Sequence, residues 1–193
     1  MKQLEEMIRT RGKTIGEEIL LVDSFLNHQV DVQLMQEIGK SFAGAFKDAR
    51  VDLVVTVESS GIAPAAFTAL FLGLPLVIMK KQTSRIMTGE MLQVPVRSFT
   101  KGTEYMLTVK REFLPEGKRV LVVDDFLASG EAAFGVMNLL EQARMEVAGI
   151  GIVIEKSFQS GRARLEKEGI RVCSLARIDH FENGTVAFRE ADR

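Results

Sequence analysis

A strand-like run in the middle of the chain leads directly into two carboxylates and a loop of small residues. Residues 120–123 are Val-Leu-Val-Val, residues 124–130 are Asp-Asp-Phe-Leu-Ala-Ser-Gly, and a helical pattern covers 131–143. An unbroken aliphatic run of this kind is typical of a strand that is buried on both faces, as in parallel sheets. The pattern therefore predicts a strand–loop–helix unit of an α/β protein, with a ligand site at the carboxyl end of the strand.

The residue types in this loop suit two different parts of one ligand. The first N–H groups of a helix have no partner within it, and its dipole is positive there, so residues 128–132 suit a phosphate. The carboxylates of Asp124 and Asp125 would repel a phosphate, but they accept hydrogen bonds from ribose hydroxyls or hold Mg²⁺. The loop thus predicts a ribose 5-phosphate site; the alternative interpretation makes these residues helix caps and turns only.

Alternation of strands and helices continues on both sides of this unit and predicts an α/β fold with a mostly parallel sheet. The predicted strands are 51–57, 75–79, 147–154, 172–175 and 186–188, and the predicted helices include 62–72 and 162–168. The chain has 193 residues without a repeat or linker, so we expect a single domain over 1–193.

The segment from Lys80 to Met106 lacks a long hydrophobic period. We interpret it as a mobile loop leading into a hairpin whose strands are Val94–Phe99 and Tyr105–Val109. A long irregular insertion in a compact domain is more often functional than accidental, although a surface excursion without function is the alternative.

Composition excludes several function classes. The formal net charge is −1, so no overall basic field attracts nucleic acid or an anionic membrane. The single cysteine, Cys173, has no partner for an intrachain disulfide, which favours a reducing, cytoplasmic location. Residues 59–79 carry no charge, but Pro64, Gly73 and Pro75 interrupt them, so we expect a buried helix, turn and strand instead of a membrane span.

Several motifs resemble a known enzyme family. The string Val120–Ala132 resembles the phosphoribosyl diphosphate (PRPP) signature of the type I phosphoribosyltransferases. Residues Val22–Asp31, Ser98–Lys101 and Gly149–Gln159 are similar to those of the bacterial xanthine phosphoribosyltransferases. The resemblance implies a cytoplasmic homodimer of purine salvage that makes xanthosine 5′-monophosphate and diphosphate from xanthine and PRPP. The balance of charge predicts no nucleic-acid or membrane partner.

The resemblance also implies a fold and its division. The type I phosphoribosyltransferase fold has a central, mostly parallel sheet flanked by helices. A flexible lid would cover about 80–106, and a small hood would come from about 1–35 and 155–193. One departure concerns the phosphate loop, which is Thr-Gly-Gly-Thr in many relatives and Ala-Ser-Gly-Glu here. Because Glu131 would repel a phosphate, we expect its side chain to point outward while the backbone binds.

For the PRPP end of the site, we expect Asp124 and Asp125 to be the catalytic pair that holds the ribose hydroxyls. The residues expected to bind the 5-phosphate are Ala128, Ser129, Gly130, Glu131 and Ala132. The turn Glu58–Gly61 is a second strand-to-helix turn at the same sheet edge, so Ser59 and Ser60 suit the pyrophosphate, with Lys81 as a point charge. Mg²⁺ is expected to be held mainly by PRPP, with no protein ligand assigned.

The purine end is expected just past the strand 147–154. Lys156 supplies a donor for a keto oxygen, and Phe158 supplies a face on which a flat base can stack. A donor at this place disfavours adenine, whose exocyclic amine is itself a donor. The amide of Asn27 matches an N–H and carbonyl edge, and the resemblance adds Leu20 and Asn27 as xanthine contacts.

Two alternatives remain open on the sequence alone. Nothing in the chemistry of Asn27 separates xanthine from guanine, so a guanine or hypoxanthine phosphoribosyltransferase is the nearest alternative. A PRPP-sensing regulator that binds nucleic acid is the second, because one fold serves several functions. An RNA-binding version would need a clustered basic face, for which Arg162, Arg164, Lys167 and Arg171 are the candidates.

Overall fold

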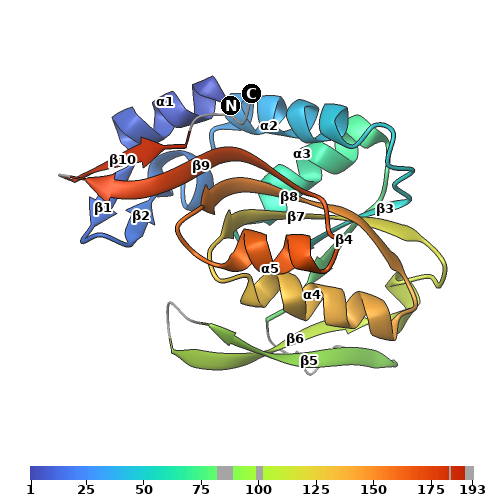
Figure 1. Ribbon diagram of the computed structural model, residues 1–193. Helices are drawn as coiled ribbons and strands as arrows, with labels where there is room; N and C mark the ends of the chain where they lie inside the picture. The colour runs from blue at the N-terminus through green and yellow to red at the C-terminus, as the bar shows by residue number, and fades with distance from the viewer. Residues whose placement is uncertain (82–88, 99–101, 183, 190–193) are drawn as a thin grey trace.

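The computed structural model of the protein describes residues 1–81, 89–98, 102–182 and 184–189. A six-stranded sheet with the order β10-β9-β8-β7-β3-β4 forms its centre (Figure 1). The sheet strands are β3 (Leu53–Val57), β4 (Leu76–Met79), β7 (Arg119–Leu127), β8 (Glu146–Lys156), β9 (Val172–Glu182) and β10 (Thr185–Phe188). All neighbours pair in parallel except β9 and β10. The predicted α/β class with a mostly parallel sheet is confirmed.

Helices cover both faces of this sheet (Figure 1). The helices are α1 (Lys2–Arg11), α2 (Val32–Ala45), α3 (Ile62–Leu72), α4 (Glu131–Gln142) and α5 (Gly161–Lys167), with a π-helical turn η1 (Asp23–Asn27) and a 3-10 turn η2 (Arg111–Phe113). Side chains of α1, α2 and α3 share one hydrophobic core, and those of α4 and α5 share the other. Successive residues of β3, such as Val54 and Val55, enter opposite cores, as the alternation of a strand requires.

Local sequence explains why the helices begin and pack where they do. Asp31 caps α2, because its carboxylate accepts a hydrogen bond from the backbone N–H of Leu34 at 3.1 Å. A side chain at Gly39 would place its Cβ 2.6 Å from the backbone of Phe67, so glycine permits the close approach of α2 and α3. Gly73 has a φ of +67° and ends α3 in the left-handed conformation that glycine adopts readily.

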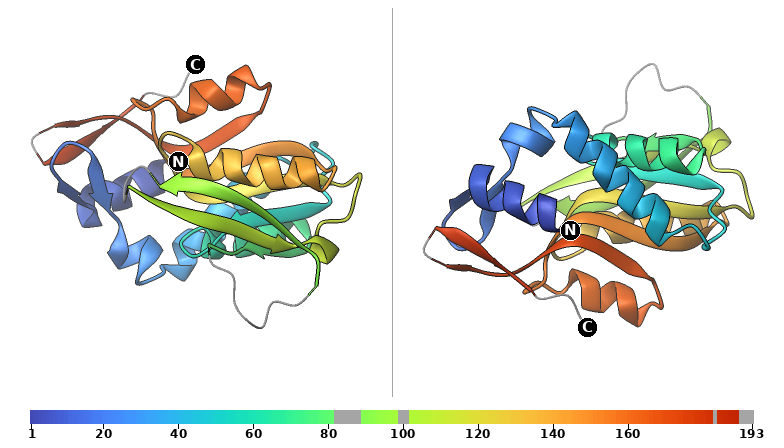
Figure 2. Two further views of the ribbon diagram at one scale, coloured as in Figure 1. Left: turned by 90° about the horizontal axis from the view of Figure 1, so that it is seen from below. Right: turned by 90° about the horizontal axis from the view of Figure 1, so that it is seen from above.

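Two hairpins lie outside the central sheet. β1 (Lys13–Ile15) pairs with β2 (Ile19–Leu21), and β5 (Met91–Ser98) pairs with β6 (Thr103–Lys110). The β5–β6 hairpin lies along α4 (Figures 1 and 2), where a Cβ on Gly135 would meet Val96 at 2.5 Å. Both strands of this hairpin are longer than predicted. Residues 82–88 and 99–101 of the expected lid lie outside the described residues.

The C-terminal strands differ most from the sequence prediction. β9 continues seven residues beyond the predicted end at Leu175, because its second half pairs with β10. This extension carries the strand toward α1 and the β1–β2 hairpin, which both contact β10 (Figure 2). In the ranges that the structure describes, no helix has the length and apolarity needed to cross a bilayer.

Candidate active site

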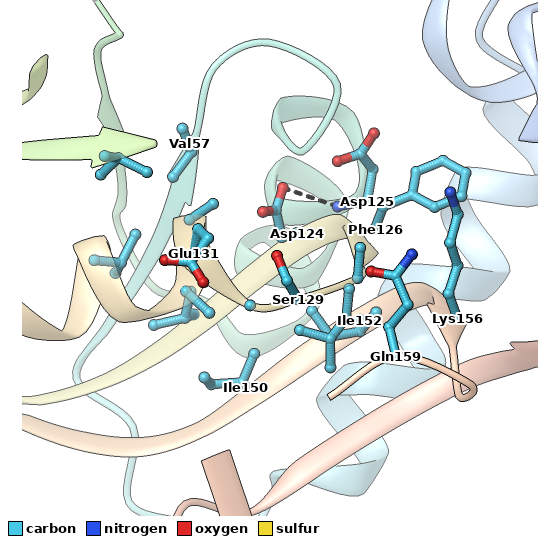
Figure 3. A pocket seen from close by; sticks show the side chains of 18 of the residues that line it. Val57, Asp124, Asp125, Phe126, Ser129, Glu131, Ile150, Ile152, Lys156 and Gln159 are labelled. Atoms are coloured by element: carbon cyan, nitrogen blue, oxygen red, sulfur yellow. Dashed lines mark hydrogen bonds between the residues drawn. The ribbon is translucent and has the colours of Figure 1, made fainter. Parts of the chain in front are cut away.

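A cavity of about 600 Å³ opens at the carboxyl ends of β3, β7 and β8 (Figure 3). Parallel strands bring their carboxyl ends to the same edge, which is where α/β sheets bind ligands. The β1–β2 and β5–β6 hairpins complete the wall. Among the residues that line it are Glu18, Ile19, Lys81, Tyr105, Phe126, Lys156 and Gln159, together with 124, 125 and 127–133.

The two aspartates, Asp124 and Asp125, lie on β7 and not in a loop as expected. β7 continues to Leu127 because β8 is long enough to pair with it, with Asp124 opposite Ile152 and Leu127 opposite Glu155. The backbone N–H of Asp125 donates a hydrogen bond to Oδ1 of Asp124 at 2.9 Å. Strand geometry places successive side chains on opposite sides, yet both residues line the cavity, which lies at the carboxyl end of β7.

Burial dominates the electrostatics of this aspartate pair. Burial raises the pKa of Asp124 well above its usual range, and the neighbouring charge of Asp125 raises it further. Burial also raises the pKa of Asp125, whereas the ammonium of Lys81 favours the ionised form of both carboxyls. Tyr105, on β6, faces the same group, since burial first and the charge of Asp124 second raise its pKa. The aspartate pair can thus accept hydrogen bonds, and the Lys81 ammonium favours its negatively charged form.

The phosphate loop (residues 128–132) follows β7 and opens α4. Gly130 has a φ of +91°, and all five residues line the cavity. The back of the loop is held by α5, whose Gly161 N–H donates to the carbonyl of Ala128 at 3.0 Å. Since the first N–H groups of α4 lack partners within the helix, this arrangement offers donors and a positive dipole to an anion.

Glu131 stands at the cavity wall, and its charge is paired. Its carboxylate accepts a hydrogen bond from Nη1 of Arg164 at 2.5 Å, and the same guanidinium atom donates to the carbonyl of Ser129 at 2.6 Å. Arg164 also lies over the ring of Phe134 at 4.4 Å. A phosphate bound to the loop would therefore face a neutral ion pair at this position.

Lys81 also lines the cavity, and the turn before α3 lies beside the aspartate pair. The Lys81 ammonium lines the cavity and sits 5.6 Å from the centre of the Tyr105 ring. Ser59 and Ser60 are not among the residues that line the cavity. Their turn nevertheless packs against it, because a Cβ on Gly61 would lie 2.7 Å from Oδ1 of Asp124.

A lysine and an aromatic ring form the other end of the cavity. Lys156 is the last residue of β8, and its Nζ donates to the carbonyl of Glu18 at 2.5 Å and lies 6.0 Å from the centre of the Phe126 ring. Burial lowers the pKa of Lys156. Figure 3 shows Gln159 beside Lys156 and Phe126, with its amide directed into the same region.

Three of the residues expected to contact a purine lie outside this cavity. Phe158 is 43% exposed and packs edge-on against Phe181, with ring centres 5.9 Å apart. Leu20 lines a second cavity of about 250 Å³ between α1 and β10. Asn27 is exposed at the end of η1. The structure instead brings Phe126, Gln159 and Ile19 to the positions around Lys156.

These additional lining residues were not predicted from the sequence. Phe126 lies in the motif Val120–Ala132 and Gln159 in the motif Gly149–Gln159, so these motifs could have indicated both residues as part of the site. Tyr105 lies in a predicted hairpin strand and within the expected lid, whereas Ile19 lies on a hairpin that the sequence did not predict. No group of three or more metal-ligating side chains occurs within the part of the chain that the structure describes.

Known proteins match the chain over most or all of its length. The phosphoribosyl transferase domain matches residues 22–187. A xanthine phosphoribosyltransferase of Streptococcus agalactiae is 54% identical over 192 residues, which is 100% of both chains. A xanthine phosphoribosyltransferase of an Exiguobacterium species is 51% identical over 193 residues, again 100% of both.

Solved structures agree in fold. Adenine phosphoribosyltransferase of Rhodothermus marinus superposes with a TM-score of 0.74 at 21% identity, over 92% of this chain and 100% of that one. The enzyme of Trypanosoma brucei superposes with a TM-score of 0.76 at 15% identity, over 91% and 78%. The predicted type I phosphoribosyltransferase fold and the resemblance seen in the sequence are confirmed: the chain belongs to the phosphoribosyltransferase family, with the bacterial xanthine phosphoribosyltransferases as its full-length relatives.

Proposed function

We propose that this protein is a purine salvage enzyme that transfers the 5-phosphoribosyl group of PRPP to xanthine, forming xanthosine 5′-monophosphate and diphosphate. The observation that carries the proposal is a single cavity in which the aspartate pair adjoins a phosphate loop on one side and Lys156 on the other. Full-length similarity to proteins named xanthine phosphoribosyltransferase supports the choice of base.

The PRPP molecule is proposed to lie along the aspartate pair. The phosphate loop would bind the 5-phosphate through backbone N–H groups, and the two carboxylates would accept hydrogen bonds from the ribose hydroxyls. The Lys81 ammonium would contact the diphosphate as a point charge, and the turn with Ser59 and Ser60 would supply hydroxyl and N–H donors from beside it. Ionisation of the aspartates is favoured by that same lysine.

Magnesium is proposed to enter with the substrate. Mg²⁺ is usually held by one or two carboxylates together with substrate phosphates and water, so a cage of protein ligands is not required. The diphosphate of PRPP is proposed to chelate the ion, and no protein ligand is assigned to it. Bound there, the ion would offset the negative charge of the departing diphosphate.

The base would bind between Lys156 and Phe126. The lysine donates to a keto oxygen and disfavours the amine of adenine, while the ring of Phe126 offers a stacking face. Leu20, Asn27 and Phe158 stay proposed base contacts, on the strength of the family resemblance. Because they lie outside the cavity, they would reach the base only through movement of the hairpin and turns that carry them.

Catalysis would consist mostly of positioning and of charge stabilisation in the leaving group. No obligate general base is assigned, because xanthine is acidic enough to attack as its anion. Transfer passes through an oxocarbenium-like state that bulk water would capture, so the lid over about 80–106 would close before the diphosphate leaves.

The assembly and location belong to the same proposal. We expect a cytoplasmic homodimer, as the family resemblance implies, with a hood from about 1–35 and 155–193. The regulator alternative is weakened by the state of the candidate basic face. Arg162 and Arg164 are paired with acidic side chains, and Arg171 donates to the carbonyl of Ala45 and lies 4.9 Å from the centre of the Phe46 ring.

The decisive experiment measures diphosphate release with PRPP and Mg²⁺ while xanthine, guanine, hypoxanthine and adenine are offered separately. Strong preference for xanthine is the expected result. Comparable turnover of guanine would keep the reaction and refute the selectivity. Binding of PRPP without release of diphosphate from any base would move the protein to the regulator class.

A further inference from the structure

The helix α5 lies directly behind the two ends of the active-site cavity. It follows β8 by a short turn, residues 157–160, that carries Gln159. Its first residue, Gly161, packs against the phosphate loop so closely that a Cβ there would lie 2.3 Å from the carbonyl oxygen of Ala128. Arg162 and Arg164 are two residues apart on this helix and therefore leave it in different directions.

Arg162 connects α5 to a buried carboxylate beside Lys156. Glu155 is only 1% exposed, and its two oxygens accept hydrogen bonds from Nε of Arg162 at 2.9 and 3.0 Å and from Nη2 at 2.6 Å. The hydroxyl of Ser157 donates to the same carboxylate at 2.6 Å. Ser174 and Arg177 donate from β9. Lys156 thus lies between Glu155 and Ser157, whose side chains are hydrogen-bonded to each other.

Arg164 connects α5 to the phosphate loop. Its Nη1 atom binds both the carbonyl of Ser129 and the carboxylate of Glu131, and its guanidinium stacks on Phe134. Because the C=O and N–H of a trans peptide point in opposite directions, the N–H of Gly130 points away from the Arg164 guanidinium. The same arginine neutralises the one acidic side chain in the loop sequence.

We propose that α5 positions both substrate subsites through separate arginines: Arg162, acting through Glu155 and Ser157, sets the purine end, and Arg164, acting through Ser129 and Glu131, sets the phosphate loop. This inference rests on the proposed function, which supplies the two substrates. Neither guanidinium lines the cavity, so both are positioning residues. Each connection governs the affinity for one substrate, and the two effects are separable.

The test compares variants that cut one connection at a time. Ser157→Ala and Glu155→Gln should raise KM for xanthine about tenfold with KM for PRPP changed less than about twofold, because tenfold corresponds to the loss of about one hydrogen bond to the base. Arg164→Met should do the reverse. Arg144→Met is the matched control, since Arg144 is 77% exposed and pairs with Glu116 far from the cavity. We expect it to change neither constant.

A second pair of variants separates positioning from loss of structure. Adding Glu131→Gln to Arg164→Met should recover part of the PRPP affinity, because it removes the carboxylate that the first change leaves unpaired. A merely structural role for Arg164 predicts no recovery. If Arg164→Met does not fold, Arg164→Lys keeps a positive charge without the two-sided contact and should still raise KM for PRPP selectively.

The inference is overturned if the Glu155, Ser157 and Arg164 variants all raise KM for both substrates. It is also overturned if they change neither KM, as expected for Arg144→Met. It fails separately from the proposed function. A wild-type enzyme that releases no diphosphate would refute the function. Calorimetric titration of wild type and variants with PRPP and with xanthine would then still show whether the two connections act on different ligands.

Discussion

The carboxylate of Glu155 should make the unfolding free energy of the protein fall as pH is lowered, and the substitution Glu155→Gln should remove this contribution. Burial alone raises the pKa of this carboxyl, but the hydrogen bonds from Arg162, Ser157 and Ser174 outweigh it and lower the pKa from 4.5 to about 2. The folded state therefore binds a proton less readily than the unfolded state. The stability gained is complete above the unfolded pKa and is lost as pH falls toward 2.

The magnitude follows from the two pKa values. Lowering a pKa from 4.5 to about 2 corresponds to about 3 kcal/mol of unfolding free energy at neutral pH. About 1 kcal/mol of this should be gone by pH 4 and about 2 kcal/mol by pH 3. Glu155→Gln keeps the shape of the side chain but does not titrate, and it leaves Arg162 and Arg177 without their shared carboxylate. At pH 7 we expect it to cost about 3 kcal/mol.

Urea unfolding of both proteins at pH 7, 4 and 3 measures the effect, because contributions from other groups cancel in the difference. The gap between wild type and Glu155→Gln should narrow by about 2 kcal/mol from pH 7 to pH 3. Glu146→Gln is the control, since Glu146 begins the same strand and its side chain is 68% exposed. A gap that stays constant with pH would refute the view that Glu155 is an ionised, multiply bonded carboxylate.

Three further substitutions test the proposed site. Asp124→Asn should lower kcat about a hundredfold while KM for xanthine changes little, because the lost charge acts on the ribose in the transition state; equal losses in both constants would exclude this role. Gly61→Ala should lower the melting temperature and weaken PRPP binding, since its Cβ would lie 2.4 Å from Oγ1 of Thr56 and 2.7 Å from Asp124, whereas Gly44→Ala meets nothing within 4 Å and should not. The lowered pKa of Lys156 predicts that kcat/KM for xanthine falls at a less alkaline pH than an ordinary lysine would give, because the donor loses its charge as pH rises. A pH–rate profile of Lys156→Arg should lack that loss, and a profile unchanged from wild type would contradict the assignment.

The hydrophobic pattern predicted where most elements begin, but not always where they end. Helix 62–72 was placed correctly because Gly73 stops it with a left-handed conformation. The predicted end of β7 at residue 123 was wrong, because two adjacent aspartates are typical of a loop. Whether Asp124 continues a strand depends on the length of β8 opposite it, and β8 reaches to Lys156. The conformational preference of a residue does not indicate how long the strand that pairs with it is.

The parts of the site that come from one continuous segment could be predicted from the sequence, whereas the parts assembled from distant segments could not. The phosphate loop and the aspartate pair come from one continuous segment, so their order along the chain shows their arrangement. Tyr105 enters the cavity on the β5–β6 hairpin, which packs against α4, and Ile19 on the β1–β2 hairpin, which contacts β10. Glu155 lies near the end of β8, and its buried carboxylate is bonded to arginines 7 and 22 residues away. No local pattern predicts such a cluster.

The departure at Glu131 is compatible with phosphate binding for a physical reason that the sequence alone does not supply. A carboxylate in the first turn of α4 interacts favourably with the helix dipole, so by itself it would compete with a phosphate for the positive helix end. The ion pair with Arg164 draws this carboxylate toward α5 and balances its charge. What remains for the ligand is the set of backbone N–H groups, whose geometry is fixed by Gly130 and by the Ser129 carbonyl that Arg164 holds. The change at position 131 therefore alters how the charge of the loop is balanced and is compatible with the phosphate binding proposed for it.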